Sequence, residues 1–237
     1  MPLRDEAESF ADTLSDTLRR VLLGDMSVGA VEAPDGARYI VQPLTGAGLL
    51  RRLPLYVAGR ELADLTVQLY LEMDTLGKFL KAVKSKLAIH SILDSKQPLV
   101  RLEYISGLVN QPVAHWHFHA ERGSLTRLLT LAHENQPREF ESPHTLSSLH
   151  FPVGGERFRP CTEDFLEFLV RECGVDAEPG WQTALAEGRQ RWRRMQLRTA
   201  VRDLQAEAAQ VLEAHGWTVT PPKGRALTES LNTLVKW

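Results

Sequence analysis

The chain has 237 residues, with 28 Lys and Arg against 30 Asp and Glu, so its formal net charge is -2 at neutral pH. Hydrophobic residues make up 43% and charged residues 24%, which excludes collagen-like, coiled-coil and largely disordered proteins. A chain of this length can bury a core as one large domain, or as one domain with a helical appendage. Because the overall charge does not attract nucleic acid or an anionic membrane, any such binding must come from a local basic patch.

Cysteine usage and the N-terminus bear on the compartment. Cys161 and Cys173 are too few for a disulfide framework. They are expected near opposite ends of one helix, about 18 Å apart at the rise of an α-helix, so we predict free thiols in a reducing compartment. The first six residues are acidic and lack the apolar segment of a signal peptide, and no stretch approaches the length of a membrane span. These features predict a cytoplasmic protein without a membrane segment.

The first elements are a helix and a hairpin. Apolar residues recur at helical spacing over 7–22, acidic residues occupy the first turn, and Gly24 stops the helix. Strand-like runs at 28–31 and 39–41 flank Pro34-Asp35-Gly36, a turn signal that predicts a β-hairpin.

Further strands are expected in the middle of the chain. Apolar and polar residues alternate over 65–74, the pattern of a half-buried strand. Residues 78–93 fit either a short helix or an edge strand. Residues 99–105 and 113–121 predict a second hairpin.

The remaining elements are mostly helical. Residues 125–133 predict a helix and 146–151 a strand. Thr162, followed by two acidic residues, is the expected N-cap of a helix that Gly174 ends. A long helical region should follow over 181–215.

Together the elements predict an α+β fold, in which an antiparallel β-sheet packs against helices on its apolar face and a helical extension follows at the C-terminus. We divide the chain into an N-terminal helix (1–24), an α+β domain (25–178), and a helical extension and tail (179–237).

A histidine-bearing strand is the most informative segment. Alternate residues of a strand point to opposite faces, so Trp116 and Phe118 would pack inward. The opposite face would carry His115, His117, His119 and Glu121. If the hairpin centres near Val109, Glu103 sits opposite His115 and Arg101 opposite His117, at cross-strand contact distance. Tyr70, Glu72 and His150 could extend this polar face.

Three interpretations of this face are open. The plainest is a solvated sheet face whose outer positions are free to vary. The second is a metal-dependent hydrolase in which His-x-His supplies two ligands to an ion such as zinc. The alternative ligands are His117, His119, Glu121 and His150, with Glu103 and His144 as further candidates for a third ligand. Because His115 and His119 lie about 13 Å apart along a strand, all three strand histidines are not expected on one ion.

The third interpretation is phosphodiester cleavage without a metal. One imidazole takes a proton from a ribose 2′-hydroxyl while another protonates the leaving oxygen, chemistry that suits the near-neutral pKa of histidine. His115 and His117, about 7 Å apart on a strand, would flank the scissile phosphate. Arg101 would stabilise the transition-state charge, and Glu103 or Glu121 would orient an imidazole. These catalytic candidates need no cofactor.

Arginines supply candidate nucleic-acid contacts. Arg157 and Arg159 follow a glycine pair between a strand and a helix, where guanidinium groups can meet an anion or simply extend into solvent. On the long helix, one stripe contains Arg191, Arg194, Arg198 and Arg202. It could bind a nucleic-acid backbone, with Trp192 as a stacking group, or seat an acidic partner protein, or form a solvated face. A separate apolar face is marked by Leu197, Val201, Leu204, Ala208 and Val211.

Four segments carry a family resemblance: AHWHFHAERG (114–123), LSSLHFPVGG (146–155), RFRPC (157–161) and EDFL (163–166). Over about residues 60–220 the chain resembles a family of bacterial proteins encoded beside a helix-turn-helix and zinc-peptidase-like regulator, the arrangement of RosmerTA-type toxin–antitoxin phage-defence pairs. TumE-like toxins are similar only in outline. The resemblance implies a toxin with an antitoxin partner. It does not indicate which residues are catalytic. The function expected from it is a toxin or defence effector that acts on RNA, possible alternatives being the metal-dependent hydrolase and a non-catalytic protein- or nucleic-acid-binding module.

Overall fold

A computed structural model describes residues 3–74, 77–93, 96–109, 111–119, 151–153, 158–221, 223–224, 229 and 232–235. The helix expected at 125–133 and most of the strand expected at 146–151 lie outside the described residues. The same holds for four of the candidate site residues, namely Glu121, His144, His150 and Arg157. Among the described residues, no helix combines the length and apolarity needed to cross a lipid bilayer.

The N-terminal helix and first hairpin form as predicted. Helix α1 (Leu3–Val21) buries an apolar stripe against the sheet, and acidic residues occupy its first turn, where they complement the helix dipole. Strands β1 (Gly29–Glu32) and β2 (Tyr39–Gln42) pair antiparallel across the predicted turn.

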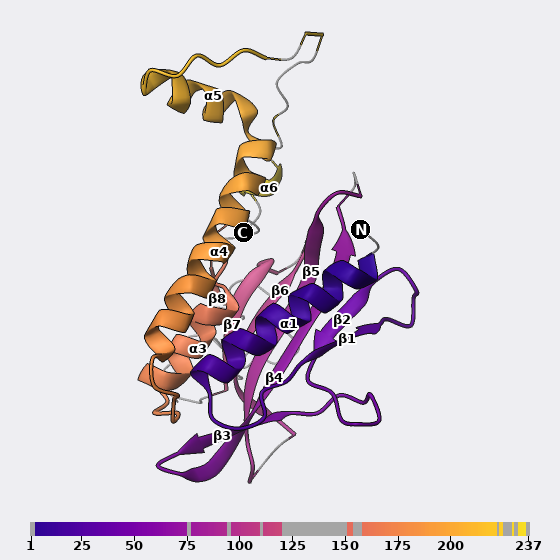
Figure 1. The fold of residues 1–237 in the computed structure, drawn as a ribbon, viewed down its shortest axis with the longest axis vertical. Helices are drawn as coiled ribbons and strands as arrows, with labels where there is room; N and C mark the ends of the chain where they lie inside the picture. The colour runs from indigo at the N-terminus through magenta and orange to yellow at the C-terminus, as the bar shows by residue number, and fades with distance from the viewer. Residues whose placement is uncertain are drawn as a thin grey trace, which may run out of the picture.

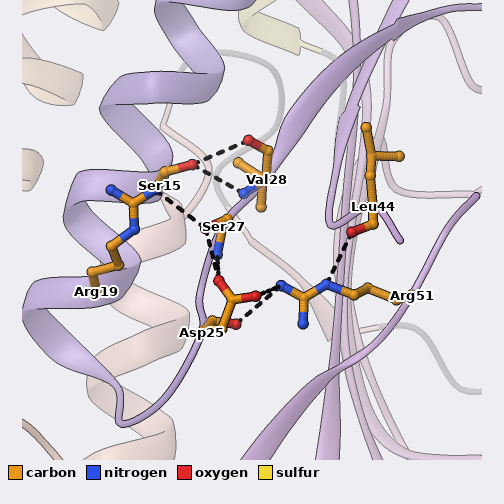
Figure 2. Close-up of polar contacts among 7 residues, drawn as sticks. All are labelled: Ser15, Arg19, Asp25, Ser27, Val28, Leu44 and Arg51. Atoms are coloured by element: carbon orange, nitrogen blue, oxygen red, sulfur yellow. Dashed lines mark hydrogen bonds and ion pairs between the residues drawn. The ribbon is translucent and has the colours of Figure 1, made fainter. Parts of the chain in front are cut away.

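Polar contacts fix the loop between α1 and β1 (Figure 2). The buried hydroxyl of Ser15 accepts a hydrogen bond from Val28 N–H at 3.0 Å and donates to the Val28 carbonyl at 3.2 Å. The Asp25 carboxylate accepts from Ser27 N–H at 3.2 Å and from the Arg51 guanidinium at 2.7 Å. The Ser27 hydrogen bonds, together with Arg51, lower the pKa of Asp25, so this loop is tied at neutral pH to α1 and to the segment after β2.

One antiparallel sheet organises the chain, in the strand order β1-β2-β4-β5-β6-β7-β8, with β3 paired to β4. The additional strands are β3 (Leu53–Val57), β4 (Arg60–Met73), β5 (Leu80–Ser91), β6 (Pro98–Ile105), β7 (Ala114–Phe118) and β8 (Phe151–Pro152). The α+β expectation is therefore confirmed. The analysis of the sequence did not predict β3, whose five residues are interrupted by Pro54.

Strand β5 corrects the expectation for 78–93. It is neither a short helix nor an edge strand, because it pairs with β4 on one side and β6 on the other. Its side chains alternate: Leu87 and Ile89 join the core, while Lys84 and Lys86 point to the opposite face. The two lysines masked this alternation in the sequence, since lysine is typical of edges rather than of central strands.

Helices cover the apolar face of the sheet (Figure 1). The C-terminal helices are α3 (Thr162–Arg171), α4 (Trp181–Asp203), α5 (Gln205–Ala214) and α6 (Asn232–Val235). Helix α4 packs on α1 and α3 and then continues beyond the sheet to α5, which forms the expected C-terminal extension. The backbone leaves the helical conformation at Leu204, so the region predicted as one helix is divided into α4 and α5.

One local expectation about these helices is wrong. The N-cap of α3 is Cys161 rather than Thr162, and the Asp164 carboxylate accepts a hydrogen bond from Cys161 N–H at 3.0 Å. The separate apolar face of α4 and α5 is largely exposed, with Leu197 at 64% and Val211 at 50% exposure. Both cysteines are free thiols, as predicted.

An arginine joins α3 to α4 and makes stability depend on pH. Arg189 donates to Asp164 at 2.7 Å and to Glu167 at 2.5 Å. Burial alone would raise the pKa of Asp164, but the Cys161 N–H and Arg189 lower it. A carboxyl group with a lowered folded-state pKa stabilises the fold above its unfolded pKa, and this contribution is lost as the pH falls below about 4.

We therefore expect Arg189→Gln to lower the free energy of unfolding at pH 7 by about 1–2 kcal/mol, and by less at pH 3. Urea unfolding at both pH values measures this. Arg171→Gln is the matched control, because Arg171 pairs with Glu167 on the surface and such pairs contribute about 0–1 kcal/mol. An equal loss for Arg189→Gln at both pH values would contradict the ion-pair account.

Candidate functional site

The predicted register of the histidine strand is confirmed. In the β6–β7 pair, Glu103 lies opposite His115 and Arg101 opposite His117. Trp116 and Phe118 point to the helix-covered face, where Trp116 stacks on Phe165 of α3 with ring centroids 5.5 Å apart. Because this apolar packing determines which side chains of β7 face the helices, the imidazoles of β7 share the opposite face.

Three side chains converge there, and we name Glu103, His115 and His117 the His–Glu–His cluster. Oε2 of Glu103 lies 3.8 Å from Nε2 of His115 and 3.4 Å from Nε2 of His117. The two imidazole rings meet edge to face, with centroids 4.7 Å apart. His115 is 2% and His117 4% exposed, so these rings do not belong to a solvated sheet face.

The carboxylate of this cluster is ionised. Burial alone would raise the pKa of Glu103, but the contact with His115 and the charges of Arg101, His117 and Lys86 lower it to about 2. Arg101 contributes a guanidinium nitrogen 3.7 Å from Oε2 of Glu103. The cluster therefore contains a negatively charged carboxylate, which its cationic and polar neighbours stabilise.

A polar row continues the cluster across the sheet. Glu103 lies opposite Lys86 on β5, and Lys86 lies opposite Gln68 on β4. The amide of Gln68 donates to Gln42 on β2 at 2.9 Å. The analysis of the sequence missed Lys86. The strand alternative that it left open for 78–93 places Lys84 and Lys86 on one face by period-two alternation.

Next to the cluster lie two buried N–H groups. Nδ1 of His119 lies 2.9 Å from the amide nitrogen of Gln97, which donates, so the ring proton is on Nε2. This Nε2 and the Nε of Arg101 are both buried and have no hydrogen-bond partner among the described residues. Burial, together with the charge of Arg101, lowers the pKa of His119, so its ring is neutral. We name these two N–H groups the anion donors.

Among the described residues, one group of side chains could hold a metal ion: the ligand atoms of Glu103, His115 and His117 lie within 4.8 Å of one another. His119, one of the expected ligands, instead contacts Gln97. A strand histidine four residues from His115 is too far along the chain to share its ion. Of the candidates for a third ligand, Glu103 on the neighbouring strand is the one that lies among the described residues beside both imidazoles. Two of the other expected ligands, Glu121 and His150, lie outside the described residues.

Arg159 is half-buried and stacks on two aromatic rings. Its guanidinium lies 3.6 Å from the ring centroid of Tyr104 and 4.9 Å from that of Trp192. This stacking is on the helix-covered face of the sheet, because Tyr104 alternates with Glu103 along β6. Arg159 therefore connects β6 to α4 and does not reach the cluster. Trp192, the candidate stacking group for a nucleic-acid base, contacts the guanidinium of Arg159.

The arginine stripe of α4 divides into two groups. Arg191 donates to Thr17 of α1 at 3.4 Å, and Arg202 pairs with Asp74 at 3.3 Å. Arg194 and Arg198 are exposed, and within the described part of the chain they form no ion pair. Because α4 packs on the helix side of the sheet, the stripe and the His–Glu–His cluster face different directions and do not form one site.

Comparisons of the chain with protein-family models, with curated proteins and with solved structures found no match. The chemistry of the site therefore rests on its geometry alone.

Proposed function

We propose that this protein is the toxin of a bacterial toxin–antitoxin phage-defence pair, a cytoplasmic effector that cleaves phosphodiester bonds in RNA at the His–Glu–His cluster. An antitoxin is its proposed protein partner. The toxin role rests on the resemblance carried by residues 114–123, 146–155, 157–161 and 163–166. The chemistry rests on the described site.

The observation that carries the proposed chemistry is the pair of anion donors beside an ionised carboxylate and two imidazoles. A buried N–H group without an acceptor costs about 1–3 kcal/mol, a cost that a bound anion removes. Arg101 and His119 are diagonal neighbours on one face of the β6–β7 pair, so one phosphate group can accept from both. In the transition state these donors stabilise the additional negative charge.

The cluster supplies the proton transfer. Two imidazoles placed on either side of a phosphate would act as acid and base, but the rings of His115 and His117 are in contact and converge on one carboxylate. A phosphate does not fit between them. We therefore assign the whole cluster to proton transfer, in which it takes the proton of the attacking hydroxyl group or water and returns it to the leaving oxygen as the P–O bond breaks. The anion donors are assigned to the phosphate.

Expression of the chain alone in bacteria, followed by RNA cleavage with purified protein, tests the proposal. Wild type is expected to arrest growth and to cleave single-stranded RNA, and His117→Ala to do neither while retaining its circular dichroism spectrum. Cleavage in the presence of a chelator separates a metal-free reaction, which keeps full activity, from a metal-dependent one, which loses it.

Toxicity that survives both His115→Ala and His117→Ala would refute a catalytic role for the cluster. The binding-module alternative predicts the reverse pattern, in which loss of the arginine stripe abolishes function and loss of the imidazoles does not. The quadruple change of Arg191, Arg194, Arg198 and Arg202 to Gln distinguishes the two.

A further inference from the structure

The tautomer of His115 is fixed by a backbone carbonyl. Nδ1 of His115 lies 2.6 Å from the carbonyl oxygen of Pro112, and a carbonyl oxygen only accepts hydrogen bonds. Nδ1 therefore carries a proton, and Nε2 is the ring nitrogen turned toward Glu103. It lies 3.8 Å from Oε2 of that carboxylate. With Nδ1 held by the carbonyl, Nε2 is the atom of this ring that can bind a metal ion.

The distances from Glu103 to the two imidazoles are close to those between ligand atoms around a tetrahedral metal ion. Separations of 3.4 Å and 3.8 Å from Oε2 of Glu103 to the two Nε2 atoms exceed the range of about 2.7–3.2 Å for N–H···O hydrogen bonds. A tetrahedral ion with ligand bonds of about 2.0–2.1 Å holds its ligand atoms about 3.3–3.4 Å apart. An octahedral ion with similar bonds needs a shorter separation, about 3.0 Å.

Support around the ligands is also of the kind that metal sites use. A metal-bound imidazole commonly donates its other ring N–H to a backbone carbonyl, which sets the tautomer and the ring orientation. His115 makes this contact with Pro112. Glu103 is supported by Arg101 at 3.7 Å. All three ligand side chains lie on paired strands, whose register fixes their separation.

We propose that Glu103, His115 and His117 bind one divalent zinc ion in tetrahedral geometry, with the fourth position open to water or to a phosphate oxygen. Two imidazoles, one carboxylate and an open position form a ligand set of catalytic rather than structural zinc. Arg101, with a guanidinium nitrogen 3.7 Å from Oε2 of Glu103, adds positive charge beside the ligands. The site therefore fits a phosphate-bearing ligand better than a neutral one.

The zinc site stands on ligand geometry and does not depend on the proposed function. Protein purified from cells and then stripped with chelator should bind one equivalent of Zn²⁺ in isothermal titration calorimetry. Co²⁺ should bind in its place and give the intense visible absorption of a tetrahedral site. Saturating Zn²⁺ should raise the midpoint of thermal unfolding by about 5 °C or more, because the ion binds the folded state.

Glu103→Gln keeps the size of the side chain and is expected to weaken Zn²⁺ binding at least about 100-fold, since even a change outside the ligand shell weakens it 10- to 100-fold. His119→Gln is the matched control: it lies two residues from a ligand on the same face, and it should retain one equivalent of Zn²⁺ while losing affinity for phosphate. Circular dichroism confirms that each variant is folded.

Absence of Zn²⁺ binding and of a thermal shift in wild type would overturn the zinc site, as would unchanged binding by Glu103→Gln. If Glu103→Gln fails to fold, the thermal shift of the wild-type protein decides alone. Zinc binding without RNA cleavage would refute the proposed function only, and RNA cleavage by a protein that binds no zinc would refute the zinc site only.

Discussion

Arg101→Gln is expected to lower the rate of RNA cleavage about 100- to 1,000-fold and to relieve growth inhibition, because loss of one preorganised donor to a transition-state anion has this effect. The guanidinium carries both an unpartnered buried Nε and the contact with Glu103 at 3.7 Å. The loss should fall on the rate constant more than on the Michaelis constant, since the donor acts on charge that develops during the reaction. Single-turnover cleavage of a defined oligoribonucleotide measures it.

A surface arginine provides the control for this change. Arg60 is exposed on β4 and belongs to neither the cluster nor the stripe, so Arg60→Gln should leave cleavage and toxicity unchanged. Arg101→Lys is a second probe: it keeps the positive charge but loses the planar donor set, and should recover only a small part of the rate. A wild-type rate of cleavage for Arg101→Gln would refute the assignment of Arg101 as a donor to the phosphate.

The β6–β7 hairpin shows why part of this site could be predicted from the sequence. Trp116 and Phe118 are large apolar residues at every second position, which fixes the inward face of β7. The hairpin centre at Val109 then sets the register, and with it the pairing of Glu103 with His115 and of Arg101 with His117. Phase and register are local properties, and local sequence determines them.

The remaining features depend on contacts between distant segments. Whether the imidazoles were solvated or buried could not be predicted, because burial depends on what covers the face and not on the strand itself. Lys86 joined the site only through the central placement of β5, which is a property of the whole sheet. Arg159 stacks on rings of β6 and α4, and no spacing in the sequence relates those elements.

The cluster is also tied to the core through the backbone of β7. The rings of His115 and His117 project from one face of a strand whose intervening residue, Trp116, is held between Phe165 and Phe168 on the other face. Aromatic packing on the helix side therefore sets the height and orientation of the imidazoles. Precise positioning matters here because small displacements of reacting groups reduce catalysis strongly.

Phe165→Ala is accordingly expected to lower the free energy of unfolding by about 3–5 kcal/mol, the usual cost of removing a buried aromatic ring. Phe165 is 0% exposed and stacks on Trp116 with centroids 5.5 Å apart. Urea unfolding monitored by tryptophan fluorescence measures the loss. Phe158→Ala is the control, since Phe158 is 75% exposed and should change stability by less than about 0.5 kcal/mol. A loss below about 1 kcal/mol for Phe165→Ala would show that α3 does not support β7, and with it that the imidazoles are positioned by something else.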